Sequence, residues 1–187
     1  MNPDEKVEVS IPVRAGEVLG VARVRPGQCC LDWGVVDYGV TLGFIHPETY
    51  PPSMAHAVCP LDYLREDLRE RAYQKVRRVD EPRGGKIDYD LPGRLSGNWF
   101  LEGGEPGVWN WSRHLAFVYH TFNASQPVVS VGGNALSPLP TGLYNASGPD
   151  PASVTVESGV VTYYLTYVAG EAEPEDVNFT LIVQGGV

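Results

Sequence analysis

Apolar and polar residues alternate along much of this chain with a period of two, the pattern of half-buried β-strands. Near the N-terminus, apolar Val7, Val9, Ile11 and Val13 alternate with Glu8, Ser10 and Pro12. The clearest alternation covers residues 177–184. Further strands are expected at 18–24, 31–44, 86–91, 95–101, 114–120, 128–132, 153–157 and 160–168. The 21 Gly and 16 Pro indicate many turns between them, so the pattern predicts a mainly β protein.

One segment instead has apolar residues at three- and four-residue spacing, typical of one face of an α-helix. Its apolar residues are Leu61, Leu64, Leu68, Ala72, Val76 and Val79. The spacing predicts one substantial helix over residues 61–79, with Pro60 in its first turn. We expect its apolar stripe to pack on the β core. On that expectation Leu68→Ala costs about 2–5 kcal/mol of stability.

Glycines at 16 and 20 predict a β-hairpin over residues 13–20, and residues 31–38 should return as a strand beside it. This is how the core of a barrel-sandwich hybrid is built. We therefore expect a barrel-sandwich-hybrid-like N-terminal half carrying the one helix, followed by a β-sandwich-like C-terminal part. The Gly- and Pro-rich break at 102–107 predicts a boundary between residues 1–105 and 106–187, unless these form one continuous domain.

Two short segments, Ala15–Gly20 (AGEVLG) and Leu31–Asp37 (LDWGVVD), resemble motifs of lysostaphin-type zinc endopeptidases. The resemblance covers about residues 7–45 and implies their barrel-sandwich fold. Two further stretches, Cys59–Leu64 (CPLDYL) and Leu95–Gly103 (LSGNWFLEG), resemble uncharacterised bacterial proteins that carry such a domain in degenerate form. The resemblance implies a fold and no established activity.

The zinc-binding histidines of that family have no counterpart in this sequence. Asp32 and Gly34 fall about where the two histidines of the family's H-x-H strand would lie, and none of the four histidines is followed four residues later by aspartate. A zinc-activated water needs three protein ligands and a base. We therefore expect neither a metal site nor a cofactor.

Charge and composition narrow the classes of partner. The chain of 187 residues has a net charge of −9, which argues against binding to nucleic acid or anionic lipid. It has no apolar run of membrane-spanning length and no apolar signal-peptide core at the given N-terminus. Of its three cysteines, Cys29 or Cys30 could bridge Cys59; the simpler interpretation is three small buried residues.

The aromatic residues supply the first candidate site. Trp109 and Trp111 lie in a Gly-, Asn- and Ser-rich setting that favours exposure, where they could stack on a glycan or peptide, whereas Trp99 and Phe100 are expected in the core. A second candidate joins Asp37, His46 and His56, a set that a hydrolase with a rearranged site could use. Asp88 and Asp90 share the polar face of a predicted strand, and solvent is their expected partner.

These observations favour a non-catalytic binding or structural protein of the bacterial cell envelope or exterior. Its partner would be a peptide, a glycan or another protein. The alternative is the hydrolase built on Asp37, His46 and His56.

Because the zinc ligands are missing, we predict no lysostaphin-type endopeptidase activity. The measurement incubates the purified protein with zinc and either peptidoglycan or glycine-rich peptides, and looks for new amino termini. Cleavage that a chelator abolishes would contradict the prediction and favour the hydrolase.

Overall fold

A computed structural model of the chain describes residues 10–21, 33–102, 111–133, 139–170 and 177–182. The chain divides into two units, residues 1–33 and 34–187, which are considered separately. Among the described residues, no helix has the length and apolar character needed to cross a membrane.

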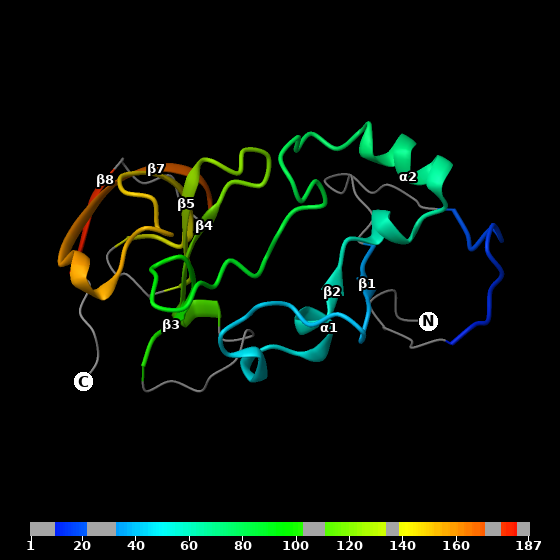
Figure 1. Cartoon of the computed structure of the whole chain (residues 1–187), viewed down its shortest axis with the longest axis horizontal. Helices are drawn as coiled ribbons and strands as arrows, with labels where there is room; N and C mark the ends of the chain where they lie inside the picture. Colours follow the sequence, from blue (N-terminus) through cyan, green and yellow to red (C-terminus); the bar gives the residue numbers. More distant parts are fainter. Residues whose placement is uncertain (1–9, 22–32, 103–110, 134–138, 171–176, 183–187) are drawn as a thin grey trace, which may run out of the picture. The chain divides into compact units, whose positions relative to one another are not determined.

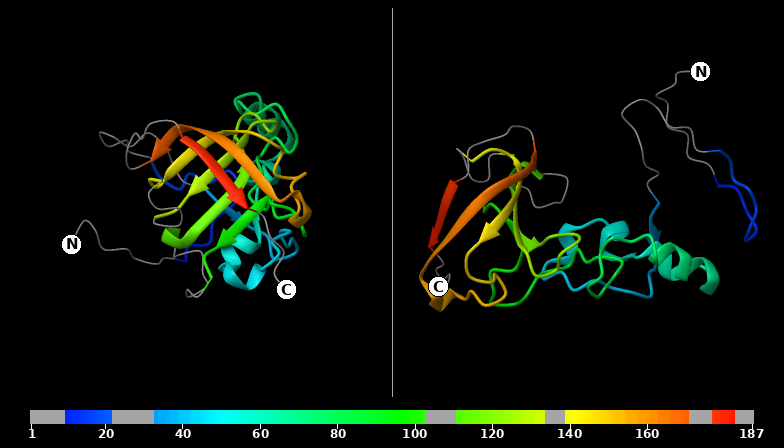
Figure 2. Two further views of the ribbon diagram at one scale, coloured as in Figure 1. Left: turned by 90° about the vertical axis from the view of Figure 1, so that its left-hand side faces the viewer. Right: turned by 90° about the horizontal axis from the view of Figure 1, so that it is seen from above.

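A six-stranded antiparallel sheet dominates the second unit, and its strands follow one another in sequence order (Figure 1). The strands are β3 (Gly97–Phe100), β4 (His114–Tyr119), β5 (Pro127–Val131), β6 (Gly142–Ser147), β7 (Val160–Gly170) and β8 (Val177–Ile182). Figure 2 shows them side by side, from green β3 to red β8. The mainly β fold class is thereby confirmed. Strands β3 and β4 pair with each other, so the boundary proposed near residue 105 falls between two neighbouring strands of one sheet.

A second, much smaller sheet joins β1 (Val35–Val36) to β2 (Ala57–Val58) in antiparallel register. Between and after these strands lie three short helical turns: η1 (Pro47–Thr49), α1 (Pro52–Ala55) and η2 (Pro60–Tyr63). The strand predicted over 31–44 is thus only two residues long within the described part. Directly after it the chain turns, because the Asp37 carboxylate accepts the Gly39 backbone N–H at 2.8 Å.

Within residues 10–21 the predicted hairpin is present only as a turn. The Glu17 N–H donates to the Arg14 carbonyl at 2.9 Å, and Gly16 adopts a positive φ of 85°. All twelve residues are exposed and none is in a strand, with Val18 and Val21 among the most exposed apolar side chains. Because these residues have no ladder partner, the described sheets do not close into a barrel.

The predicted long helix is divided into η2 and a separate helix α2 (Glu66–Tyr73). The backbone is extended at Leu64 and Arg65, with ψ angles of 151° and 145°. The Arg65 guanidinium is hydrogen-bonded to Asp67 in the first turn of α2, and the Arg65 carbonyl accepts the first helical N–H groups. Local contacts of Arg65 therefore restart the helix where the apolar spacing alone predicts continuity.

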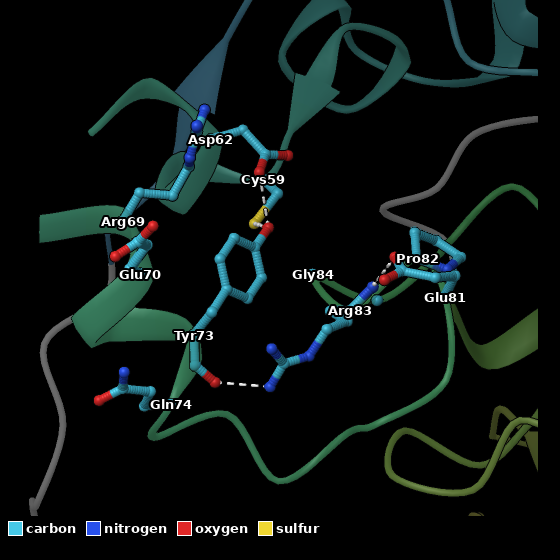
Figure 3. A pocket seen from close by; sticks show the side chains of 11 residues that line it. Cys59, Asp62, Arg69, Glu70, Tyr73, Gln74, Glu81, Pro82, Arg83 and Gly84 are labelled. Atoms are coloured by element: carbon cyan, nitrogen blue, oxygen red, sulfur yellow. Dashed lines mark hydrogen bonds between the residues drawn. The ribbon is translucent and has the colours of Figure 1, made fainter. Parts of the chain in front are cut away.

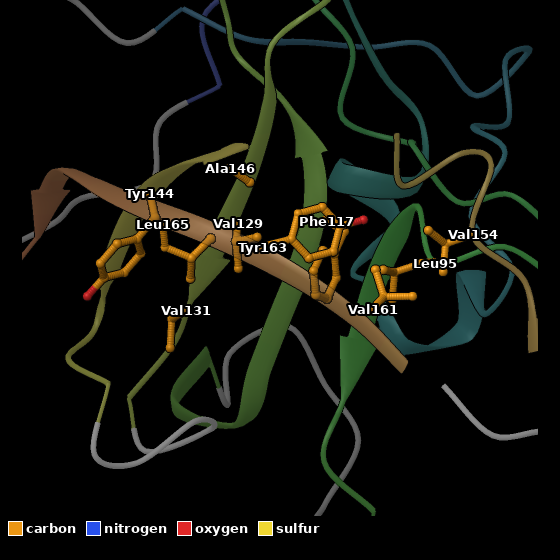
Figure 4. Packing of buried hydrophobic residues seen from close by; sticks show 10 residues of the cluster. All are labelled: Leu95, Phe117, Val129, Val131, Tyr144, Ala146, Val154, Val161, Tyr163 and Leu165. Carbon is orange, nitrogen blue, oxygen red and sulfur yellow. The ribbon is translucent and has the colours of Figure 1, made fainter. Parts of the chain in front are cut away.

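The hydrophobic core belongs to the six-stranded sheet and its adjoining loops (Figure 4). The buried cluster consists of Leu95, Phe117, Val129, Val131, Tyr144, Ala146, Val154, Val161, Tyr163 and Leu165. Along β7 the inward side chains alternate with exposed Thr162 and Tyr164, as the period of two predicts.

The prediction that the helix packs on this core is wrong. Leu68 is 42% exposed, and no residue of α2 is buried. The physical reason is that the helix, once it restarts at Glu66, has only Leu68 and Ala72 as aliphatic side chains, too little apolar surface to dock.

A matched pair of leucines tests this arrangement. We expect Leu68→Ala to change the free energy of unfolding by less than about 1 kcal/mol, because the side chain is already largely hydrated. Leu165→Ala, at a fully buried position, should cost about 2–5 kcal/mol. Denaturant unfolding measures both, and a larger loss at Leu68 than at Leu165 would contradict the assigned core.

Two buried tyrosines of the core differ in the hydrogen bonding of their hydroxyl groups. Tyr144 donates a hydrogen bond to the Pro140 carbonyl at 2.8 Å, whereas the Tyr163 hydroxyl has no partner among the described residues. Burial, with a smaller contribution from the Asp150 carboxylate, raises the pKa of Tyr163 to about 12. A buried hydroxyl without a partner opposes folding.

We therefore expect Tyr163→Phe to leave stability at pH 7 unchanged or to raise it by about 1 kcal/mol, and Tyr144→Phe to lower it by about 1 kcal/mol. The pKa of Tyr163 is raised in the folded state, so the unfolded chain loses the hydroxyl proton at a lower pH than the folded protein does. The free energy of unfolding is therefore unaffected by this group below about pH 10 and falls as pH rises from about 10 toward about 12. Tyr163→Phe should therefore lose less stability than the parent protein across that interval. Unfolding curves recorded from neutral to alkaline pH test this, and an unchanged alkaline slope would count against it.

Candidate functional site

The structure brings Asp37 and His56 together at the small sheet. The Asp37 N–H donates to the His56 carbonyl at 3.0 Å, one residue beyond the β1–β2 ladder. The Asp37 carboxylate accepts a short hydrogen bond from the Tyr63 hydroxyl, which lowers the pKa of Asp37, and the Gly39 N–H lowers it further. Asp37 thereby holds the turn after β1 and stays ionised.

His46 and His56, the two histidines of the second candidate set, lie in different loops and have different partners. His56 Nδ1 lies 2.5 Å from the Val40 carbonyl oxygen, and its ring contacts Tyr38 at 5.2 Å between centroids. His46 belongs to a different loop, where it faces Glu48 at 3.1 Å in an exposed pair. Among the described residues, no group of three or more His, Cys, Asp or Glu side chains could hold a metal ion.

The two tryptophans of the aromatic candidate set are for the most part not among the residues that the structure describes. Trp109 is outside the described residues, and for Trp111 only the backbone, at the start of η3 (Trp111–Arg113), is described. Their role in binding stays a prediction.

A third tryptophan, Trp99, lines a cavity of about 410 Å³. Strand β3 positions it opposite Leu115 of β4, and its indole Nε1–H donates to the Leu95 carbonyl at 2.8 Å. This bond fixes the ring while leaving the side chain 46% exposed, which contradicts its predicted place in the core. The remaining wall of this Trp99 pocket is largely apolar, with Ile45, Leu91, Leu95, Phe100 and Val156, and His46 and Arg94 also line it.

The Asp90 carboxylate also lines the Trp99 pocket and accepts three hydrogen bonds from the chain. Its Oδ1 accepts the backbone N–H of Asn98 at 2.9 Å and the side-chain amide of Asn98 at 3.2 Å. Its Oδ2 accepts the Ile45 N–H at 3.0 Å. Asp88, two residues earlier, accepts the Gly43 N–H at 2.8 Å. The expectation that both carboxylates face only solvent is therefore wrong, because they bind a loop 45 residues away in sequence.

A separate cavity of about 540 Å³ is formed around Tyr73 of α2 (Figure 3). The Tyr73 hydroxyl donates to the Asp62 carboxylate at 2.6 Å and lies 3.4 Å from the Cys59 sulfur. Burial first, and then the bond to Asp62, raises the pKa of Tyr73. Since its one hydroxyl proton is directed at Asp62, the Cys59 thiol is the donor of the second bond. The Cys59 sulfur is thereby hydrogen-bonded within the cluster.

Gly84 packs closely against one side of Cys59, which lines the cavity. A Cβ added at Gly84 would lie 2.5 Å from the Cys59 sulfur, so only glycine fits there. Arg83 donates to the Tyr73 carbonyl at 2.6 Å and lies 5.3 Å from the Tyr73 ring centroid. Cys59 is free and half-buried, while Cys29 and Cys30, its candidate disulfide partners, lie outside the described residues.

Sequence reasoning missed Trp99 as a pocket residue and Tyr73 as the centre of a hydrogen-bonded cluster. Trp99 occurs in an alternating stretch on the same side as Leu95 and Leu101, so the local pattern gave no signal that distinguished it from a core residue. No local signal could have joined Tyr73 to Cys59, because they lie 14 residues apart. No protein-family model, curated protein or solved structure matches this chain.

Proposed function

We propose that this chain is a non-catalytic binding protein, and that the Trp99 pocket receives an apolar side chain of a peptide or protein segment. The observation that carries the proposal is the fixed, half-exposed indole on the wall of a cavity of about 410 Å³. A concave apolar pocket with few polar groups is the usual form of a ligand site. Exposed aromatic rings held in one orientation are frequent anchors of protein interfaces.

The chemistry of the walls favours a peptide over a glycan. A glycan requires several hydrogen-bonding groups directed at its hydroxyls, and the pocket's carboxylate, Asp90, is already engaged by Asn98 and Ile45. The indole N–H is likewise committed to the Leu95 carbonyl. The pocket presents mainly apolar surface and a ring face, with Arg94, His46 and Thr155 as further polar side chains on its wall.

The wider proposals rest on the sequence. The resemblance of Ala15–Gly20 and Leu31–Asp37 to lysostaphin-type endopeptidases supports a degenerate relationship to that family and, with it, a place in the bacterial cell envelope or exterior. The alternative hydrolase has weaker support, because Asp37, His46 and His56 would have to act from two different loops with separate partners.

Selection of peptides from a random phage-displayed library tests the proposed function. We expect enrichment of peptides with an aromatic or aliphatic anchor, and a loss of affinity of at least about tenfold in Trp99→Ala, as for a central interface anchor. Trp33→Ala is the matched control, because Trp33 is 51% exposed and lies outside the pocket; its affinity should stay within about twofold.

Thermal unfolding of both variants checks that they remain folded. Failure to enrich any peptide, or an equal loss in the two variants, would contradict the proposal. Binding to a glycan array with no peptide binding would replace the peptide with a carbohydrate ligand.

A further inference from the structure

The side chain of Arg78 is a buried cation that has no ion-pair partner among the described residues. It is only 3% exposed. Its Nε donates to the carbonyls of Asp80 at 3.1 Å and Pro82 at 2.9 Å, and its Nη1 to those of His120 at 3.4 Å and Thr121 at 3.1 Å. Within the described ranges Nη2 has no hydrogen bond, and none of the ion pairs there includes Arg78.

Among the described residues, Asp62, Asp80 and Asp88 form no ion pair with Arg78 and accept hydrogen bonds from other groups. Asp80 accepts the Ala124 N–H at 3.1 Å. Asp62 accepts the Tyr73 hydroxyl, and Asp88 binds the Gly43 N–H and lies 3.9 Å from the Lys86 ammonium. The four carbonyl oxygens stabilise the guanidinium by their dipoles, but they do not cancel its net charge. A buried charge without a counter-charge is unfavourable, and an added anion relieves this.

Arg78 lines a cavity of about 720 Å³, which we call the Arg78 cavity. This volume is that of a small-molecule site, and the cavity is distinct from the Trp99 pocket, with which it shares no lining residue. Its walls include aliphatic Leu42, Val58 and Ile87, and the aromatic rings of Tyr89 and Tyr119, which contact each other at 5.4 Å between centroids. The lining also includes Lys86 and the carboxylates of Asp62 and Asp88, and Lys86 lies near Asp88. Arg78 is the cation of this lining that forms no ion pair among the described residues, and it fits a molecule with an apolar body and one anionic end.

We propose that the Arg78 cavity binds a small organic acid, with its carboxylate on Arg78 Nη2 and its apolar body against Ile87, Tyr89 and Tyr119. A single negative charge fits better than a phosphate, because Asp62 and Asp88 line the same cavity and repel further charge. Lys86, the other cation of the wall, is already near Asp88. This site is independent of the proposed peptide pocket.

The first measurement uses simple acids on the intact chain. Hexanoate and 3-phenylpropionate are titrated against the matched amides and inorganic phosphate, with the ¹⁵Nε resonance of Arg78 as the reporter. We expect saturable shifts with the acids and at least about tenfold weaker binding of the amides, because these lack the charge that Arg78 requires. Equal binding of acids and amides, tighter binding of phosphate, or no saturable shift with either acid would overturn the proposal.

The second measurement avoids mutating Arg78 itself, whose loss could unfold the chain. Ile87→Glu places a carboxylate on the cavity wall at a position that is 51% exposed, so the variant should fold. Val79→Glu is the matched control, adding the same charge at a position that is 76% exposed and outside the cavity. We expect Ile87→Glu to weaken acid binding by at least about tenfold and Val79→Glu by less than about twofold. Equal effects of the two substitutions would contradict the assignment to this cavity.

Discussion

Two carboxylates, Asp88 and Asp90, attach the loop around residues 43–45 to the six-stranded sheet. Their spacing of two residues matches that of the N–H groups they bind, on Gly43 and Ile45, so side chains here replace the backbone ladder of a strand pair. Asp90 extends the connection to Asn98 on β3. The close approach requires Gly97, which has a φ of 133° and whose added Cβ would lie 2.8 Å from the Asp90 Cα. Both the Trp99 pocket and the Arg78 cavity have walls on this connection.

Different interactions stabilise the sheet and the segments beside it. The sheet buries a continuous apolar cluster, centred on side chains such as Phe117, Tyr163 and Leu165. The segment 78–82 is instead held by polar contacts, in which the Arg78 guanidinium joins its own turn to the carbonyls of His120 and Thr121. Replacing a buried charged group that has several hydrogen bonds is costly, so this connection depends on arginine specifically.

The two proposed binding sites differ in the kind of surface that they present to a ligand. The Trp99 pocket presents mainly apolar surface, and its indole N–H and Asp90 carboxylate are already hydrogen-bonded within the chain. The Arg78 cavity presents a buried guanidinium that forms no ion pair among the described residues, inside walls that combine apolar, aromatic and carboxylate side chains. A nucleophile, Cys59, and a carboxylate, Asp62, both line the Arg78 cavity, and each is hydrogen-bonded to the Tyr73 hydroxyl. The Cys59 thiol, the strongest nucleophile among the described residues, donates a hydrogen bond to the Tyr73 hydroxyl and packs against Gly84.

The sequence by itself determined the mainly β class and five of the six strands of the large sheet, because an alternation of two residues depends only on which face of a strand is buried. It did not predict β6, and the strands expected at 86–91 and 153–157 are not formed. Alternating Val161, Tyr163 and Leu165 are buried as that pattern requires. The apolar spacing did not reveal the true length of the helix, because local hydrogen bonds between Arg65 and Asp67 interrupt a spacing that looks continuous. Tertiary structure decided its exposed position. It also decided every feature of the two cavities. Contacts such as Asp90 with Ile45, or Arg78 with Thr121, join residues more than forty positions apart, and no local pattern of apolar and polar residues encodes such a pairing.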